Sequence, residues 1–154
     1  MSSEDVPPPP QAARKHAWIH VENKTSDIFK VQIVHKYTGE SIEDSKIVQL
    51  NPGEDKSVLK VTYNVGIFTT GVDNWKVKAY KLVENGKKDE DGNKLYDVEN
   101  WRTGHSAGDD WKKHTLRSED HDRVTTIRIK KDEVEFDSPS GTSTSEFKKG
   151  SYDD

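Results

Sequence analysis

Hydrophobic and polar residues alternate along most of the chain between positions 17 and 137. In the first such segment, Ala17, Ile19 and Val21 alternate with Trp18 and His20. The same period of two recurs in the segments 28–37, 58–63, 75–80, 127–130 and 133–137. Because successive side chains of a β-strand point to opposite faces, this period predicts strands with one buried and one solvated face.

Turn-forming residues separate these segments. The turn signals are Asn51-Pro52-Gly53, Asn85-Gly86, Asp91-Gly92 and Lys131-Asp132. Short polar turns between strands are typical of hairpins, and we find no helical stripe of useful length. The sequence therefore predicts an all-β fold, specifically an antiparallel β-sandwich.

The two ends of the chain lack this alternation. Residues 1–15 include the four consecutive prolines Pro7 to Pro10, which fix an extended conformation and exclude a helix. Residues 139–154 are rich in serine and threonine and contain few apolar side chains that could be buried. We therefore expect a disordered Pro-rich arm at 1–15, a β-sandwich domain at 16–138 and a disordered Ser/Thr-rich tail at 139–154.

Composition narrows the class of protein further. Of the 154 residues, 30% are hydrophobic and 34% are charged, and the formal net charge is -4. We find no basic stripe that would neutralise a nucleic-acid backbone and no apolar run as long as a membrane span. The chain has no cysteine, which excludes disulfides and thiolate metal sites. Because the N-terminal residues do not resemble a signal peptide, we expect a cytoplasmic protein.

The residues that could carry catalysis form no recognisable pattern. His105, His114 and His121 lie near several aspartates, and imidazole and carboxylate groups together are ligands for zinc and other divalent ions. Their spacing, however, does not place two ligands on one face of a strand or helix. There is also no Gly-x-Ser-x-Gly elbow and no Walker-type phosphate loop. We therefore predict no catalytic residues, no cofactor and no metal site.

Three stretches carry a family resemblance. They are Trp18–Ser26 followed by Val34–Tyr37, Tyr63–Trp75 with its Gly-Ile-Phe-Thr-Thr-Gly segment, and Trp111–Asp120 continuing to Ser138-Pro-Ser-Gly-Thr-Ser-Thr. Together they resemble the PUD family, named for small proteins that are up-regulated in long-lived nematodes and also common in fungi. The resemblance covers most of 17–145. It implies an antiparallel β-sandwich, the dimers known among nematode members, and an architecture like that of aegerolysins and actinoporin-like lectins, which bind lipids or sugars.

Large apolar residues in predicted loops are the candidates for an interaction surface, because exposed apolar patches usually mark binding sites. Ile67 and Phe68 lie between two glycines, which favours a loop that displays them. Trp75, Trp101 and Trp111 are candidates for a sugar-stacking platform or for anchors at a dimer interface. The alternative is that the glycine-flanked segment crosses the core and that two of the three tryptophans are buried.

The PUD family has no established activity, so the resemblance assigns no functional residues. We expect a non-enzymatic interaction or scaffold protein that associates as a homo- or heterodimer with a similar sandwich. One alternative is a lipid- or glycan-binding module that uses the loop aromatics. A second alternative is a small metal-dependent enzyme built on His105, His114 and His121.

Overall fold

The computed structural model describes residues 13–66, 70–104 and 110–152. The strands in these ranges are β1 (Ala13–Asn23), β2 (Ile28–Tyr37), β3 (Glu43–Leu50), β4 (Asp55–Val65), β5 (Asp73–Lys88), β6 (Lys94–Thr103), β7 (Lys112–Lys113), β8 (Val124–Ile129), β9 (Glu133–Ser138) and β10 (Gly141–Lys149). One short 3₁₀ helix, η2 (Ser118–Asp120), precedes β8. No helix within these ranges is long and apolar enough to cross a membrane.

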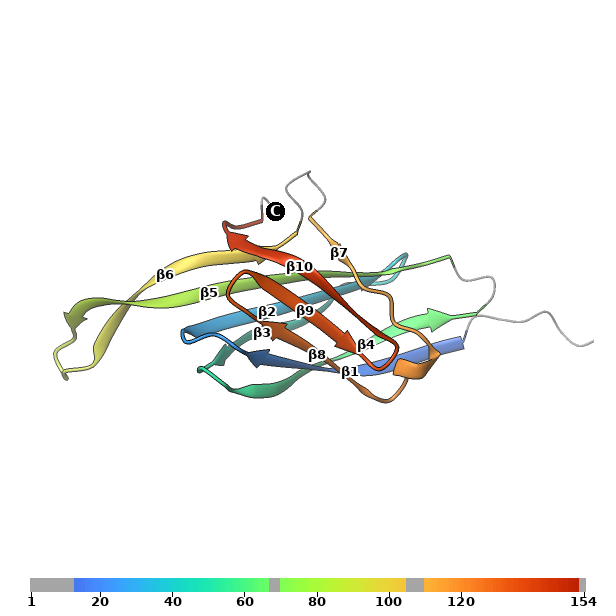
Figure 1. Ribbon diagram of the computed structural model, residues 1–154, viewed down its shortest axis with the longest axis horizontal. Helices are drawn as coiled ribbons and strands as arrows, with labels where there is room; N and C mark the ends of the chain where they lie inside the picture. Colours follow the sequence, from blue (N-terminus) through green and yellow to red (C-terminus); the bar gives the residue numbers. More distant parts are fainter. Residues whose placement is uncertain (1–12, 67–69, 105–109, 153–154) are drawn as a thin grey trace, which may run out of the picture.

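The strands form two facing layers that are connected by one hydrogen-bonded path. The order along this path is β3-β2-β5-β6-β10-β9-β8-β1-β4, and the short β7 pairs with β5. Strand β10 joins the layers, because most of it pairs with β9 whereas residues 147–149 pair with β6 (Figure 1). The predicted β-sandwich is thereby confirmed. One pair departs from the antiparallel expectation, since β1 and β8 run parallel.

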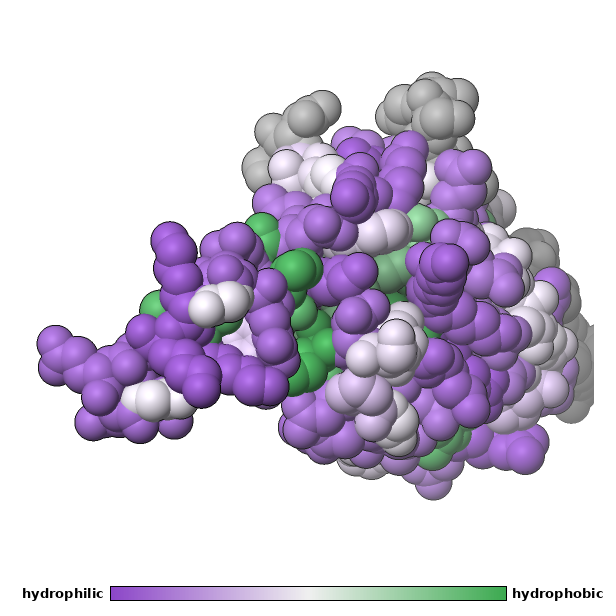
Figure 2. Space-filling model, turned by 60° about the vertical axis from the view of Figure 1, so that its left-hand side comes forward, coloured by the Kyte–Doolittle hydropathy of each residue, from purple (hydrophilic) through white to green (hydrophobic). Residues whose placement is uncertain are grey.

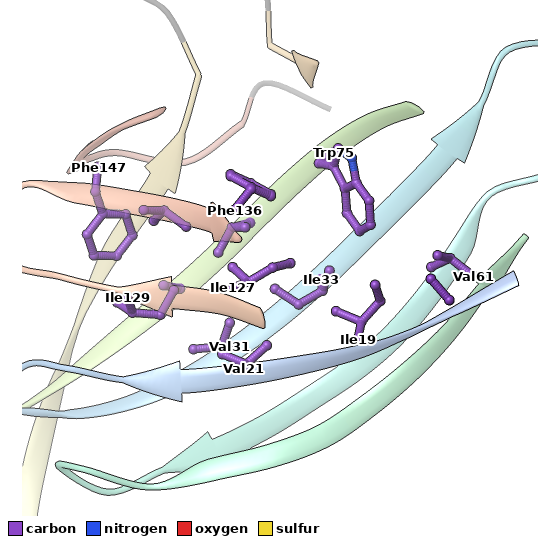
Figure 3. Close-up of a cluster of buried hydrophobic side chains, with 14 of the residues drawn as sticks. Ile19, Val21, Val31, Ile33, Val61, Trp75, Ile127, Ile129, Phe136 and Phe147 are labelled. Atoms are coloured by element: carbon purple, nitrogen blue, oxygen red, sulfur yellow. The ribbon is translucent and has the colours of Figure 1, made fainter. Parts of the chain in front are cut away.

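The alternation of residues places one face of each strand in a shared core. In β1, Ala17, Ile19 and Val21 are buried, whereas Trp18 is exposed. Figure 3 shows side chains from both layers gathered in the same space. Because burial of apolar surface is the main driving force of folding, this core determines which face of each strand points inward.

The C-terminal segment differs from the expected tail. Gly141–Lys149 form β10, so the prediction of a disordered tail at 139–154 is wrong for these residues. The side chains of Ser145 and Phe147 are buried, and the ring of Phe147 lies 5.7 Å from that of Phe29. Residues 1–12 and 153–154, which include most of the expected N-terminal arm, lie outside the described residues.

The predicted turns are correct with one exception. Asn51-Pro52-Gly53 connects β3 to β4, and Asp91-Gly92 lies at the tip of the β5–β6 hairpin. Gly53 and Gly92 have φ angles of 82° and 84°, a conformation that favours glycine. The expected turn at Asn85-Gly86 is wrong, because these residues lie inside β5 at a point where its register with β6 shifts. The irregular pairing there accommodates the glycine without ending the strand.

Candidate functional site

The β5–β6 hairpin projects beyond the rest of the sandwich (Figure 1). Strand β2 pairs with β5 only as far as Leu82, and β10 pairs with β6 only at residues 101–103. Within the described part of the chain, residues 83–97 of these strands therefore pair only with each other, whereas Val98 and Glu99 pair with Leu82 and Lys81 of β5 and have no strand on their other side. We call residues 83–99 the projecting hairpin. A two-stranded hairpin is marginally stable in water, and its two outer edges present unpaired backbone groups that can accept another strand.

Large apolar side chains are exposed on the projecting hairpin. They belong to Val83, Leu95, Tyr96 and Val98. Val98 lies opposite Leu82, and Leu82 lies opposite Ile28, so three adjacent strands share a row of apolar residues. We call Ile28, Leu82 and Val98 the apolar row. It faces away from the core, because Trp101, three positions beyond Val98, packs on the core side. Figure 2 shows apolar residues at the base of the projecting hairpin among hydrophilic neighbours.

A cleft of about 540 Å³ borders the opposite, core-side face of the hairpin base. Its walls come from the β1–β2 turn at 24–27, the β8–β9 turn at 131–132, and the facing sides of β5, β6 and β10. Phe29 and Phe147 are buried along its floor, and Trp101 is half-buried at its side. Cavities of this volume are typical of sites for small molecules.

Trp75 belongs to the core. Its side chain is 0% exposed, and its indole Nε1 donates a hydrogen bond of 3.0 Å to the carbonyl oxygen of His114. The expectation that Trp75 contributes to an interaction surface is therefore wrong, because the odd-numbered residues at this end of β5 face the other layer. Ile67 and Phe68 lie outside the described residues.

Gly71, the second glycine of the segment that contains Ile67 and Phe68, has a packing role. A Cβ atom at this position would lie 2.5 Å from the ring of Tyr37, which is closer than two atoms can approach. The Tyr37 side chain is itself buried. The close approach of the Tyr37 ring therefore explains why residue 71 is a glycine.

Trp101 and Trp111 do not form a single aromatic patch. The ring of Trp101 packs against Phe147 with centroids 5.1 Å apart, and its Nε1 donates a 2.7 Å hydrogen bond to Glu99. Trp111 lies on the other side of the sheet, where the Lys76 ammonium is 4.5 Å from the centroid of its ring. Lys76 alternates with Trp75 and Val77 in β5, so its side chain points away from the core.

The histidines that could bind a metal are not brought together. Residues 13–66, 70–104 and 110–152 contain no group of three or more His, Asp or Glu side chains arranged to hold an ion. His105 lies outside these ranges. His121 packs edge-on against the ring of His16, with centroids 4.6 Å apart. The described residues thus offer no support for a metal-dependent enzyme.

His114 is buried among hydroxyl groups. Its Nδ1 lies 2.6 Å from Ser143 Oγ, and its Nε2 lies 2.8 Å from Ser138 Oγ. Ser138 Oγ in turn lies 2.8 Å from the hydroxyl of Thr125. Burial lowers the pKa of His114 to about 4, so the imidazole is neutral at physiological pH. A neutral ring with both nitrogens engaged links β8, β9 and β10, which is a structural role.

A second buried histidine, His35 of β2, lies between two carboxylates. Its Nδ1 is 2.8 Å from Glu43 Oε1, and its Nε2 is 2.7 Å from Asp73 Oδ1. Burial disfavours the charged ring, but the hydrogen bonds to Asp73 and Glu43 outweigh it and raise the pKa of His35. The sequence contained a sign of this buried site, because His35 is a titratable residue on the apolar face of a predicted strand.

The projecting hairpin and the cleft are the features that sequence reasoning missed. A signal for the hairpin was present, because the adjacent apolar pairs Leu82-Val83 and Leu95-Tyr96 interrupt the alternation and place apolar groups on both faces. The cleft has no comparable local signal. Its aromatic residues Phe29, Trp101 and Phe147 are far apart in the chain and meet only through strand pairing.

Comparison with known proteins identifies the family. A family model described as "Up-Regulated in long-lived daf-2" matches residues 13–99 and 96–147. No curated protein matches the chain. The matched residues run from β1 into β10 and so include strands of both layers of the sandwich. The chain therefore belongs to the PUD family, whose members are described as up-regulated in long-lived daf-2.

Proposed function

We propose that this protein is a non-enzymatic interaction protein that associates with a second copy of its own sandwich through the projecting hairpin and the apolar row. One observation carries the proposal: a hairpin exposes large apolar side chains and has no third strand beside it in the described part of the chain. Exposed apolar surface of this kind marks interaction sites, and an open strand edge is a template for pairing.

A second copy is the simplest occupant of this surface. Two copies related by a twofold axis present the same patch to each other, so one surface is enough to form a closed dimer. In such an arrangement the edge of β6 pairs with its symmetric copy, and Val98 packs against the apolar row of the partner. A related sandwich that carries the same row could replace the second copy, which gives a heterodimer by the same contacts.

Both signs of charge on the projecting hairpin fit this arrangement. Lys87 and Lys88 lie on one side of the turn, and Asp89, Glu90 and Asp91 follow directly. An antiparallel approach of two such hairpins can bring opposite charges together, which would favour one register over others. The cytoplasmic location expected from the sequence stays a prediction.

Sedimentation equilibrium at micromolar concentration tests the proposal. We expect a species of twice the 17.5 kDa mass of the chain. Val98→Asp should shift the equilibrium to the monomer, because it places a charge in the centre of the interface. Ile42→Asp is the matched control, since Ile42 is 56% exposed and Val98 is 59% exposed, but Ile42 lies outside the hairpin and the apolar row.

Two results would overturn the proposal. One is a single 17.5 kDa species of the wild-type protein at every concentration. The other is a dimer that Val98→Asp leaves intact while the circular dichroism spectrum confirms the fold of the variant.

A further inference from the structure

The cleft beside the hairpin base combines a fixed aromatic surface with a charged rim. The ring of Trp101 packs on Phe147, and Phe147 packs on Phe29, so the three rings support one another. The hydrogen bond from Trp101 Nε1 to Glu99 holds the indole in one orientation. Trp101 is half-buried and lines the cleft, so a ring held in this way offers apolar surface to a ligand without the entropy cost of ordering it on binding.

The rim of the cleft carries both cations and carboxylates. Lys81 Nζ lies 3.4 Å from Asp27 Oδ2, and Lys149 Nζ lies 3.4 Å from Glu99 Oε2. Lys131 and Asp132 follow each other in the β8–β9 turn at the edge of the cleft. Both side chains are exposed and form no ion pair among the described residues, so their ammonium and carboxylate groups are available to a ligand.

This combination selects among ligand classes. A purely apolar ligand would remove the rim charges from water without replacing their hydrogen bonds, which is costly. A polyanion would meet the carboxylates of Asp27, Glu99 and Asp132. A sugar hydroxyl, in contrast, both donates and accepts hydrogen bonds, so adjacent hydroxyls can bond to an ammonium and a carboxylate at once. A pyranose ring also has an apolar face of C–H groups that fits an indole.

We propose that this cleft is a carbohydrate-binding site in which one pyranose ring lies against Trp101 and its hydroxyls bond to Lys131 and Asp132. The site uses the core-side face of the hairpin base, whereas the apolar row lies on the opposite face. It therefore does not depend on self-association, and each can fail without the other.

Titrations followed by two-dimensional NMR test this proposal on the full chain. The probes are glucose, galactose, mannose, N-acetylglucosamine and glucuronate, with sorbitol as a polyol that has hydroxyls but no ring. We expect at least one pyranose to shift the indole N–H of Trp101 and the amides of Lys131 and Asp132. The expected Kd is about 1 mM, as is usual for a ligand of this size. Sorbitol should leave these signals unchanged.

Two variants assign the binding to the cleft. Asp132→Ala should weaken sugar binding by about tenfold, because one charge-assisted contact is lost. Asp91→Ala at the hairpin tip is the matched control and should bind the sugar normally. Trp101→Leu should abolish binding and also assigns the indole signal. Because Trp101 packs against the core, Asp132→Ala carries the test if the tryptophan variant does not fold.

Three outcomes would overturn the proposal. In the first, none of the five sugars shifts the cleft signals at about 20 mM, well above the expected Kd. In the second, sorbitol shifts them as strongly as the sugars do. In the third, Asp132→Ala binds as tightly as Asp91→Ala.

Discussion

His35 Nε2 and Asp73 Oδ1 lie 2.7 Å apart in the core, and neither side chain is exposed to solvent. The second carboxylate oxygen of Asp73 accepts a 2.9 Å hydrogen bond from the backbone N–H of Leu116. Glu43, which bonds to the other ring nitrogen of His35, also accepts a 3.0 Å hydrogen bond from the backbone N–H of Thr62. The cluster thus joins four strands and the segment before η2. Because a buried charge is tolerated only when it is paired, its contribution to stability depends on pH.

The first prediction is a loss of stability on the alkaline side. The pKa of His35 is raised, since its hydrogen bonds to Asp73 and Glu43 outweigh the effect of burial. The folded protein therefore holds this proton more tightly than the unfolded chain does. The contribution is complete below the unfolded pKa of 6.5 and is lost as pH rises through the folded value. Urea denaturation should give a lower free energy of unfolding at about pH 9 than at about pH 6.

The variant Glu43→Gln isolates this effect. Removal of one carboxylate lowers the pKa of His35, so the free energy of unfolding should fall by about 1–2 kcal/mol at about pH 6 and change less above it. Glu146→Gln, at an exposed position of β10, removes the same charge and should leave the profile unchanged. Parallel pH profiles for wild-type protein and Glu43→Gln would show that His35 is not the titrating group.

The second prediction concerns the acid side, where His114 acts with the opposite sign. Its folded pKa of about 4 lies below the unfolded value of 6.5, so the unfolded chain binds more protons between these two values. This contribution is complete above the unfolded pKa and is lost as pH falls from 6.5 toward 4. A decrease from about pH 6.5 to about pH 5 should cost up to about 2 kcal/mol.

The variant His114→Gln provides the comparison on the acid side. An amide can bond to both Ser138 and Ser143 but does not titrate, so its free energy of unfolding should be nearly constant between about pH 6.5 and about pH 5. Measurements above about pH 5 exclude most carboxylate titration, because paired carboxylates such as Asp137 have lowered pKa values. An equally steep acid decline in the variant would contradict the assignment to His114.

The alternation of residues predicts the sandwich correctly, because burial of one face is a local property of a strand. It misses β10, because this strand buries Ser145 at a position where an apolar residue would be expected. The hydrophobic pattern of β10 is therefore too weak to predict a strand. It places Trp75 in a strand with Val77 and Ala79, so the expectation of a surface role for Trp75 rested on its aromatic side chain and not on the alternation. The cleft lies beyond local reasoning altogether, because Phe29, Trp101 and Phe147 meet only after the two layers have formed.

The third prediction is that Gly71→Ala destabilises the protein. The added Cβ would lie 2.5 Å from the ring of Tyr37, and this buried ring cannot move aside freely. Overpacking of this kind costs about 1–3 kcal/mol, which thermal unfolding can detect. Gly141→Ala is the control, because a Cβ at Gly141 would have no neighbour within 4 Å. Equal melting temperatures for the two variants would show that the backbone around residue 71 adjusts without cost.

The fourth prediction is that the projecting hairpin can be shortened without loss of the fold. Val83 and Asp97 face each other across β5 and β6, so replacement of residues 84–96 by Asn-Gly closes the two strands with a two-residue turn. The removed residues contribute nothing to the hydrophobic core cluster of the described residues. The free energy of unfolding should therefore change by less than about 1 kcal/mol, which corresponds to a shift of at most about 4 °C in melting temperature. The shortened protein should dimerise more weakly than the wild type in sedimentation equilibrium, because it lacks the exposed Leu95 and Tyr96 and part of the open edge of β6 but keeps the apolar row. A shortened protein that dimerises as tightly as the wild type would show that the removed part of the hairpin lies outside the interface, and one that unfolds would show that the hairpin stabilises the sandwich it extends from.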